Sequence, residues 1–144
     1  MSSSRSTLKQ TRFKPATIWP AGSTPNGLYI DDQHGKSYIA CEGDNKLLVF
    51  DMKNHSVENV FPVGNGPDVL AFDRGLQLLY VACESGSVSV FRHSNGKLEK
   101  VGNVNVGPNS HSVSVDSETH HAYFPLKNVK GSPVLRIMAP GVAE

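Results

Sequence analysis

The sequence has little of what several classes of protein require. Its 144 residues include two cysteines and one tryptophan, and the formal net charge is only +1. So small a net charge gives no overall attraction to nucleic acid or to an anionic membrane surface. No apolar run approaches the roughly 18–20 residues that a membrane-spanning helix needs. We therefore expect no membrane association, and the composition argues against a nucleic-acid partner.

The N-terminal region has no acidic residue before Asp31, but it carries four basic ones. A secretory signal needs an apolar core of about seven or more residues, and none lies between Met1 and Trp19. We expect residues 1–11 to be a disordered leader and residues 141–144 a short tail. The chain as given has no signal peptide and would by itself be cytoplasmic, and the sequence leaves the compartment of the parent protein open.

Glycine and proline recur along the chain with a fixed spacing. The pattern Pro-x-Gly-x-x-Pro at 20–25 returns at 62–67, and Tyr-Ile-Ala-Cys-Glu at 38–42 returns as Tyr-Val-Ala-Cys-Glu at 80–84. Both offsets are 42 residues, and a third, weaker copy passes through Pro108, Asp116 and Tyr123. Internal repeats of this length are typical of stacked architectures, in which each repeat is one supersecondary unit.

A period near 42 residues fits helical arrays as well as four-stranded β-propeller blades. The local pattern separates them, because the apolar segments are short, rich in β-branched and aromatic residues, and divided by turn-forming residues about every 8–12 positions. Ser87-Val-Ser-Val-Phe-Arg92 alternates polar and apolar residues, as a half-buried strand does. Each repeat therefore predicts four antiparallel strands.

The predicted fold is all-β: a partial β-propeller of about three four-stranded antiparallel blades over residues 12–140. The first blade covers 27–63, with strands at 27–31, 36–42, 46–52 and 58–63. The second covers 69–106, with strands at 69–73, 78–84, 87–93 and 98–106. The third covers 111–139, with strands at 111–116, 121–127 and 133–139, and lacks its own fourth strand. Residues 12–20 align with a fourth strand and form a spare outer strand, where proline is tolerated.

These motifs closely resemble those of the YVTN/YncE-like β-propeller family. They comprise a Pro-Asn or Pro-Asp turn, a strand ending in Asp, a Tyr-Val-Ala strand and a Val-Phe strand, seen best at 80–91. The resemblance covers about residues 15–140 and implies the C-terminal three-blade portion of a fold that typically has seven blades. Intact members of that family are often exported.

Three blades cannot close a ring, which takes four to eight, and an open slab exposes apolar blade faces. We therefore expect one of two partners: the missing blades of a larger propeller, or a second copy of the chain. In the second case two copies form a six-blade ring, and residues 12–20 of one chain complete the last blade of the other.

The resemblance places ligands at the mouth of the central channel. The loops expected there carry six candidate ligand-binding residues: Asn26, Asp68, Asn109, His111, Glu42 and Glu84. Oxygen ligands from several blades suit a divalent cation, and the related lactonase propellers use such a channel site. However, an Asn or Asp after Pro also bonds its own turn. Only His111 clearly breaks the repeat, and its imidazole is either a general base in the channel or a packed or solvent-facing side chain.

Two other recurring residues have structural explanations. Cys41 and Cys83 hold the same position in successive blades, and sheets stack about 10 Å apart, too far for a disulfide, which needs Cα atoms within about 7 Å. We expect both to be buried small apolar residues. Asp31, Asp73 and Asp116 each close a first strand, so we expect their carboxylates to accept backbone N–H groups of the following turn.

The sequence therefore predicts no catalytic residue, no metal and no cofactor. The primary expectation is a noncatalytic scaffold that binds an unknown small ligand or protein. The alternative is a fragment of a lactonase-like hydrolase with a channel-bound divalent cation. A further alternative is a truncated gene product without independent function.

Overall fold

The computed structural model describes residue 12 and residues 21–141. Apart from Arg12 and Gly141, the predicted leader, the predicted outer strand at 12–20 and the predicted tail lie outside these residues. In the described part of the chain, no helix is long and apolar enough to cross a bilayer.

The described residues form eleven strands in three antiparallel sheets, and strand order follows chain order in each. The first sheet contains β1 (Pro25–Asp31), β2 (Lys36–Cys41), β3 (Lys46–Asp51) and β4 (Ser56–Pro62). The second contains β5 (Pro67–Asp73), β6 (Leu78–Cys83), β7 (Ser87–Ser94) and β8 (Lys97–Asn105). The third contains β9 (Ser114–Val115), β10 (Ala122–Val129) and β11 (Ser132–Met138). The all-β prediction is confirmed.

One predicted strand is much shorter than expected. The segment 111–116 contributes only the two residues of β9, whereas every other strand predicted within residues 21–141 agrees with the structure within two residues at each end. Just before it the backbone changes direction: Gly107 and Asn109 have φ values of 127° and 59°, and Pro108 has no N–H to donate. The carbonyl of His111 instead accepts the amide of Val69 in the second sheet, at 3.2 Å.

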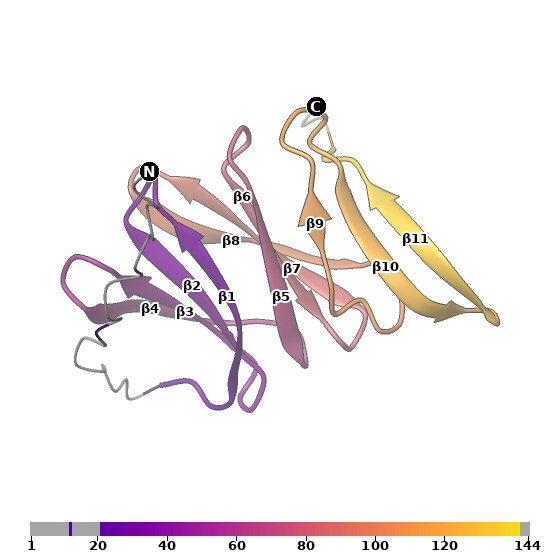
Figure 1. Cartoon of the computed structure of the whole chain (residues 1–144), viewed down its shortest axis with the longest axis horizontal. Coiled ribbons are helices and arrows are strands. Elements are labelled where there is room, and N and C mark those ends of the chain that lie inside the picture. The colour runs from indigo at the N-terminus through magenta and orange to yellow at the C-terminus, as the bar shows by residue number, and fades with distance from the viewer. Residues whose placement is uncertain (1–11, 13–20, 142–144) are drawn as a thin grey trace, which may run out of the picture.

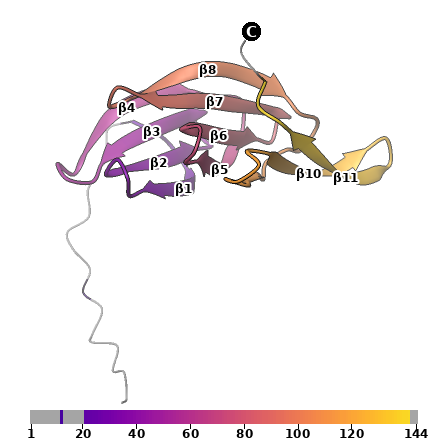
Figure 2. The ribbon, with the colours of Figure 1, turned by 90° about the horizontal axis from the view of Figure 1, so that it is seen from above.

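The three sheets fan out side by side (Figure 1). Figure 2 shows β1 and β5 along one side of the fan and the outer strands β4 and β8 along the other. The first strands of neighbouring sheets lie together, since β1 contacts β5 and β5 contacts β9. All three of these strands begin at the lower end of the view in Figure 1.

The hydrophobic core lies mainly between the sheets, in two large clusters, and a third, small cluster of Ile39, Cys41 and Leu48 lies on the other face of the first sheet. Alternate residues of β6 belong to different clusters: Leu79 and Val81 pack toward the first sheet, and Leu78 and Tyr80 toward the third. This two-sided burial explains why β6 reads as six consecutive apolar residues. Burying one large apolar side chain is worth about 1.5–3 kcal/mol, so the two clusters dominate the cohesion of the fan.

The recurring aspartates fix the turn after each first strand. Asp31 accepts the amide of His34 at 3.2 Å, Asp73 the amide of Gly75 at 2.9 Å, and Asp116 the amide of Glu118 at 2.9 Å. The sequence predicted this role from the recurrence alone. It also predicted that the two cysteines are buried, and both are free and fully buried.

Candidate functional site

The lower loops of the second sheet bring two acidic side chains together. Asp68 lies at the start of β5, and Glu84 follows directly after β6. The amide of Glu84 donates to the carbonyl of Gly66 at 2.8 Å, which holds the residue after β6 against the turn that leads into β5. Gly66 has a φ of 68°, which glycine adopts without steric cost. The two carboxylates are therefore positioned by one loop pair.

The segment before β9 adds a histidine to this pair. Ser110 is fully buried, and its hydroxyl donates to the carbonyl of Cys83 at 3.1 Å. Together with the bond between Val69 and His111, this anchors the segment on the second sheet. The Nδ1 atom of His111 lies 3.1 Å from Oδ2 of Asp68. Donor atoms of Asp68, Glu84 and His111 all lie within 4.8 Å of one another.

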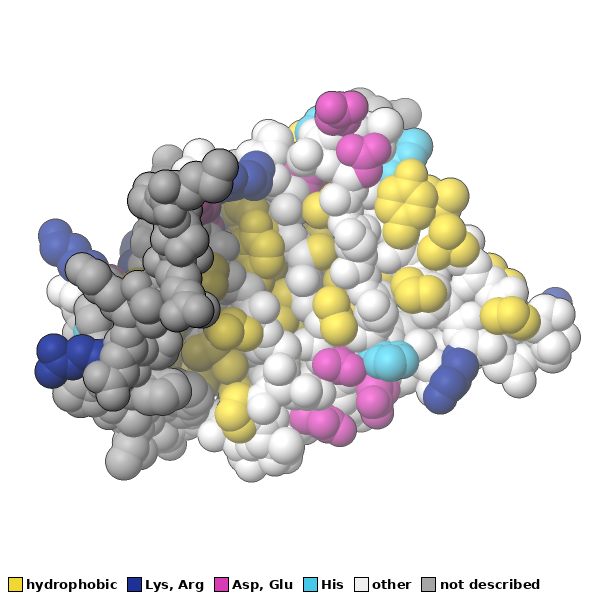
Figure 3. Space-filling view, viewed as in Figure 1, with side chains coloured by type: hydrophobic (Ala, Val, Ile, Leu, Met, Phe, Trp, Pro, Cys, Tyr) yellow, Lys and Arg dark blue, Asp and Glu magenta, His cyan; other side chains and the backbone are white. Residues whose placement is uncertain are grey.

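The cluster is open to solvent on one side. Asp68 and His111 are half-buried and Glu84 is exposed. Figure 3 shows acidic and histidine side chains meeting at the lower edge of the face that carries the first strands. A small ligand or an ion can therefore reach all three side chains.

The other three predicted site residues are not part of this cluster. Asn26 is exposed at the start of β1 and lines a cavity of about 390 Å³ on the first sheet. Glu42 is exposed, and its amide donates to the carbonyl of Thr24 at 3.0 Å. Asn109 is exposed in the bend before His111. The structure thus joins three of the six predicted residues and leaves the others apart.

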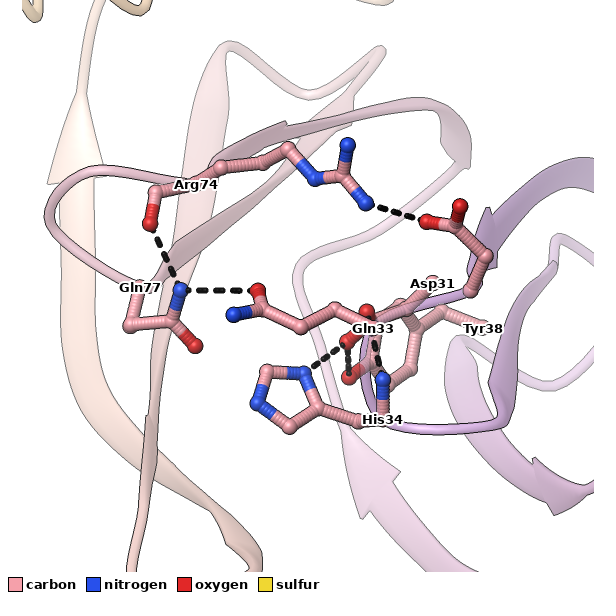
Figure 4. A network of polar contacts seen from close by, with 7 residues as sticks. Asp31, Gln33, His34, Tyr38, Arg74 and Gln77 are labelled. Carbon is pink, nitrogen blue, oxygen red and sulfur yellow. Dashed lines mark hydrogen bonds and ion pairs between the residues drawn. The ribbon is translucent and has the colours of Figure 1, made fainter.

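A second polar network, which the sequence did not reveal as a unit, lies at the opposite end of the first two sheets (Figure 4). Asp31 accepts the hydroxyl of Tyr38 and bonds to Nδ1 of His34, each at 2.7 Å. The ring of His34 stacks on that of His93 in the second sheet, with centroids 3.5 Å apart. An ion pair between Asp32 and Arg74 also joins the two sheets.

The electrostatics of this network favour a charged Asp31. Burial alone would raise the pKa of Asp31, but hydrogen bonds from Tyr38 and His34 outweigh burial and lower it. Burial and the bond to Asp31 raise the pKa of Tyr38, so its hydroxyl stays protonated as the donor. Burial and the charge of neighbouring His34 lower the pKa of His93. The network is therefore a structural junction between sheets.

Successive sheets are also linked through the turn that follows each first strand. We call the residue four positions after the recurring aspartate the fifth turn position, because the aspartate is the first. The residues there are Gly35, Gln77 and His120, and all three have φ between 59° and 66°. Gln77 donates to the side chain of Gln33 in the first sheet at 3.2 Å. His120 bonds to Asp73 in the second sheet at 2.8 Å. Aligning the repeats on their aspartates would have revealed this position.

Comparison with solved structures shows which fold the three sheets form. The chain is similar to hydrazine synthase of Kuenenia stuttgartiensis, with a TM-score of 0.64 and 16% identity over 80% of this chain and 32% of that one. It is also similar to the β-propeller domain of Myceliophteria thermophila Cps50 (Swd1), with a TM-score of 0.62 and 11% identity over 82% and 40% of the chains. The fold is a partial β-propeller. Each of the three sheets is a blade, and the third has three strands within the described residues.

A third similar structure is the dihydro-heme d1 dehydrogenase NirN in complex with DHE, with a TM-score of 0.59 and 19% identity over 81% of this chain and 24% of that one. The chain thus spans less than half the length of the structures it matches. Identities this low show the propeller fold alone, because one fold hosts many unrelated functions. No family model matches the sequence, and no curated protein matches it either.

Proposed function

We propose that the chain is a YVTN-type propeller segment that acts as a noncatalytic binding scaffold, and that two copies assemble into a six-blade ring. The observation that carries this proposal is the state of the two end faces. The second blade is covered on both sides, whereas the first and third blades each have one face that packs on no other described sheet.

The outer face of the third blade is apolar and exposed. Pro125 pairs with Leu135 and Tyr123 with Ile137 across β10 and β11, so these four side chains share one face. Leu135 is 58% exposed and Ile137 55%. Figure 3 shows hydrophobic side chains gathered over this blade. A face of this kind is typical of a buried sheet-to-sheet contact.

The first blade offers a matching surface at the other end of the fan. Leu28 is 62% exposed and Ile30 50% exposed on β1. Leu28 pairs with Ile39 on β2, and Ile39 with Leu48 on β3. Ile39 and Leu48 are already buried in a small cluster against which Ala21 packs, so the open part of this face is the apolar edge along β1. Stacking the third blade of one copy on the first blade of another would cover this edge and the outer face of the third blade, and doing so twice closes a ring of six blades.

The edge of the third blade supports the same arrangement. Among the described strands β11 pairs only with β10, which leaves its other edge free to accept a strand. A cleft of about 350 Å³ lies between β8 and the residues after β11, with Val101, Val104 and Met138 in its lining. In the proposed ring, residues 12–20 of the second copy pair with β11 and cover this cleft.

The chemistry of the nucleophiles supports a noncatalytic role. Burial raises the pKa of the Cys83 thiol to about 11 and also raises that of Cys41, so both thiols are protonated at neutral pH and poorly nucleophilic. The hydroxyl of the buried Ser110 is occupied by the carbonyl of Cys83. These groups serve packing and loop anchoring.

Light scattering coupled to size exclusion tests the assembly. We expect the chain to elute with twice its mass of 15.6 kDa. The double variant Leu135→Lys/Ile137→Lys should be monomeric with an unchanged far-ultraviolet circular dichroism spectrum, because both side chains are exposed in the single chain. Leu76→Lys is the matched control: Leu76 is 37% exposed but lies in the β5–β6 turn, away from the end faces, and this variant should stay dimeric. A folded wild-type chain that is monomeric at about 100 µM, well above the dissociation constants of specific interfaces, would disprove the ring.

The cluster of Asp68, Glu84 and His111 favours one second candidate, a lactonase-like hydrolase. In such an enzyme a cation bound at the channel mouth would polarise a lactone carbonyl. Acid release from a lactone, followed at constant pH with and without added divalent cation, decides between the two. Turnover that Glu84→Gln abolishes would establish the hydrolase, and no turnover supports the scaffold. A chain unfolded by circular dichroism would instead indicate a truncated product.

A further inference from the structure

We infer that Asp68, Glu84 and His111 form a binding site for a divalent transition-metal ion, of which Zn²⁺ is the best fit. The site would join the second blade, which supplies both carboxylates, to the segment that leads into the third. All three residues belong to one chain, so the inference does not depend on the proposed ring.

The spacing of the donor atoms suits one ion. Ligands about 2.0–2.2 Å from zinc lie roughly 3.0–3.5 Å from one another in tetrahedral or octahedral geometry. His111 Nδ1 and Asp68 Oδ2 are already 3.1 Å apart. All three donor atoms lie within 4.8 Å, and the exposed Glu84 side chain closes the remaining distance by rotation about its own bonds.

The carboxylate of Asp68 is free for this role. An aspartate after proline often bonds its own turn, and Asp31, Asp73 and Asp116 each accept turn amides. Asp68 does not: within the described residues its side chain has one hydrogen-bond partner, His111. The turn-bonding explanation for Asp68 therefore does not hold, and its carboxylate and His111 Nδ1 face one another as two adjacent donor atoms.

The other histidine–aspartate pairs lack a third donor. His34 with Asp31 and His120 with Asp73 are as close, at 2.7 and 2.8 Å, but both aspartates are buried and committed to turn amides. In the described part of the chain only the cluster of Asp68, Glu84 and His111 brings three donors together. The pair of His120 and Asp73 therefore serves as an internal control for the binding experiment below.

The donor set selects the class of metal. One imidazole nitrogen with two carboxylates suits zinc or manganese, whereas calcium and magnesium prefer oxygen ligands alone. In the affinity order of the divalent first-row metals, zinc binds a given site more tightly than manganese does. Three protein ligands at a half-exposed site leave at least one coordination position for water or another small ligand.

Isothermal titration calorimetry on the full chain without a polyhistidine tag tests the inference. We expect one Zn²⁺ per chain, weaker Mn²⁺ binding and no Ca²⁺ binding. His111→Gln and Glu84→Gln should each weaken Zn²⁺ binding about tenfold or more, since even a change next to a ligand costs 10–100-fold. His120→Gln is the matched control and should bind as wild type, because glutamine already occupies the equivalent turn position at Gln77.

Three results would overturn the inference. They are no Zn²⁺ binding to the folded wild-type chain, equal loss of affinity in His120→Gln and His111→Gln, and tighter binding of Ca²⁺ than of Zn²⁺. Circular dichroism on each variant checks that a loss of binding is not a loss of folding. Because the readout is binding, a failure here leaves the proposed scaffold and its mass measurement untouched.

Discussion

Replacing Tyr38 by phenylalanine tests whether the buried tyrosine–aspartate bond stabilises the first blade. Tyr38 is fully buried, Asp31 is 1% exposed, and the hydroxyl donates to Oδ2 of Asp31 at 2.7 Å. A hydrogen bond to a charged group contributes about 1.5–3 kcal/mol. Asp31 keeps the amide and the ring of His34 as partners, so no carboxylate is left without a donor. We therefore expect Tyr38→Phe to lower the free energy of unfolding by about 2 kcal/mol.

The repeat supplies the control for this substitution. Tyr80 holds the equivalent position in the second blade and is 2% exposed, but its hydroxyl has no protein hydrogen-bond partner among the described residues. Tyr80→Phe removes the same atom without removing a bond, so its effect should stay within about 0.5 kcal/mol.

Urea unfolding followed by circular dichroism at pH 7 and one fixed protein concentration measures both variants. The dependence of the free energy on urea should not change, because neither substitution alters the area exposed on unfolding. Equal losses in the two variants would refute the reasoning, since they would show that the bond to Asp31 contributes nothing of its own.

Two further predictions concern acid and the contact between inner strands. Hydrogen bonds lower the pKa values of Asp31, Asp51 and Asp116, that of Asp51 to about 2. Their contribution to stability is complete above the unfolded pKa of about 4 and is lost as the pH falls through the lower folded values. The urea midpoint should therefore fall as the pH drops below about 4, after a smaller decrease that begins below about 6.5 because the pKa of His93 is lowered in the folded chain, and a midpoint that rises on acidification contradicts this. A Cβ on Gly27 would lie 1.6 Å from the carbonyl oxygen of Asp68, whereas one on Gly102 would meet no atom within 4 Å. Gly27→Ala should cost at least about 1–3 kcal/mol in the same assay and Gly102→Ala nothing, and equal stability of the two variants would show that β1 and β5 do not approach so closely.

The repeat was enough to predict most of the fold, because the strand pattern and the turn residues recur with it. The shortened β9 escaped prediction since its cause is a contact between blades: the amide of Val69 takes the His111 carbonyl that a longer β9 would have used. The same contact explains the site. Sequence reasoning named Asp68, Glu84 and His111 among six candidates but had no means to separate them from Asn26, Glu42 and Asn109. That separation depends on which loops the blade packing brings together.

The fifth turn position gives the row of blades a direction. Gln77 and His120 each reach back to the blade before their own, so a blade carries the side chain that fits its predecessor and receives one from its successor. A duplicated second blade would place Gln77 beside the turn of its twin, where Gly75 holds the position of Gln33 and has no side chain to accept the bond. Growth by copying that unit would therefore need a new contact at the junction, so this turn restricts which blade can follow which.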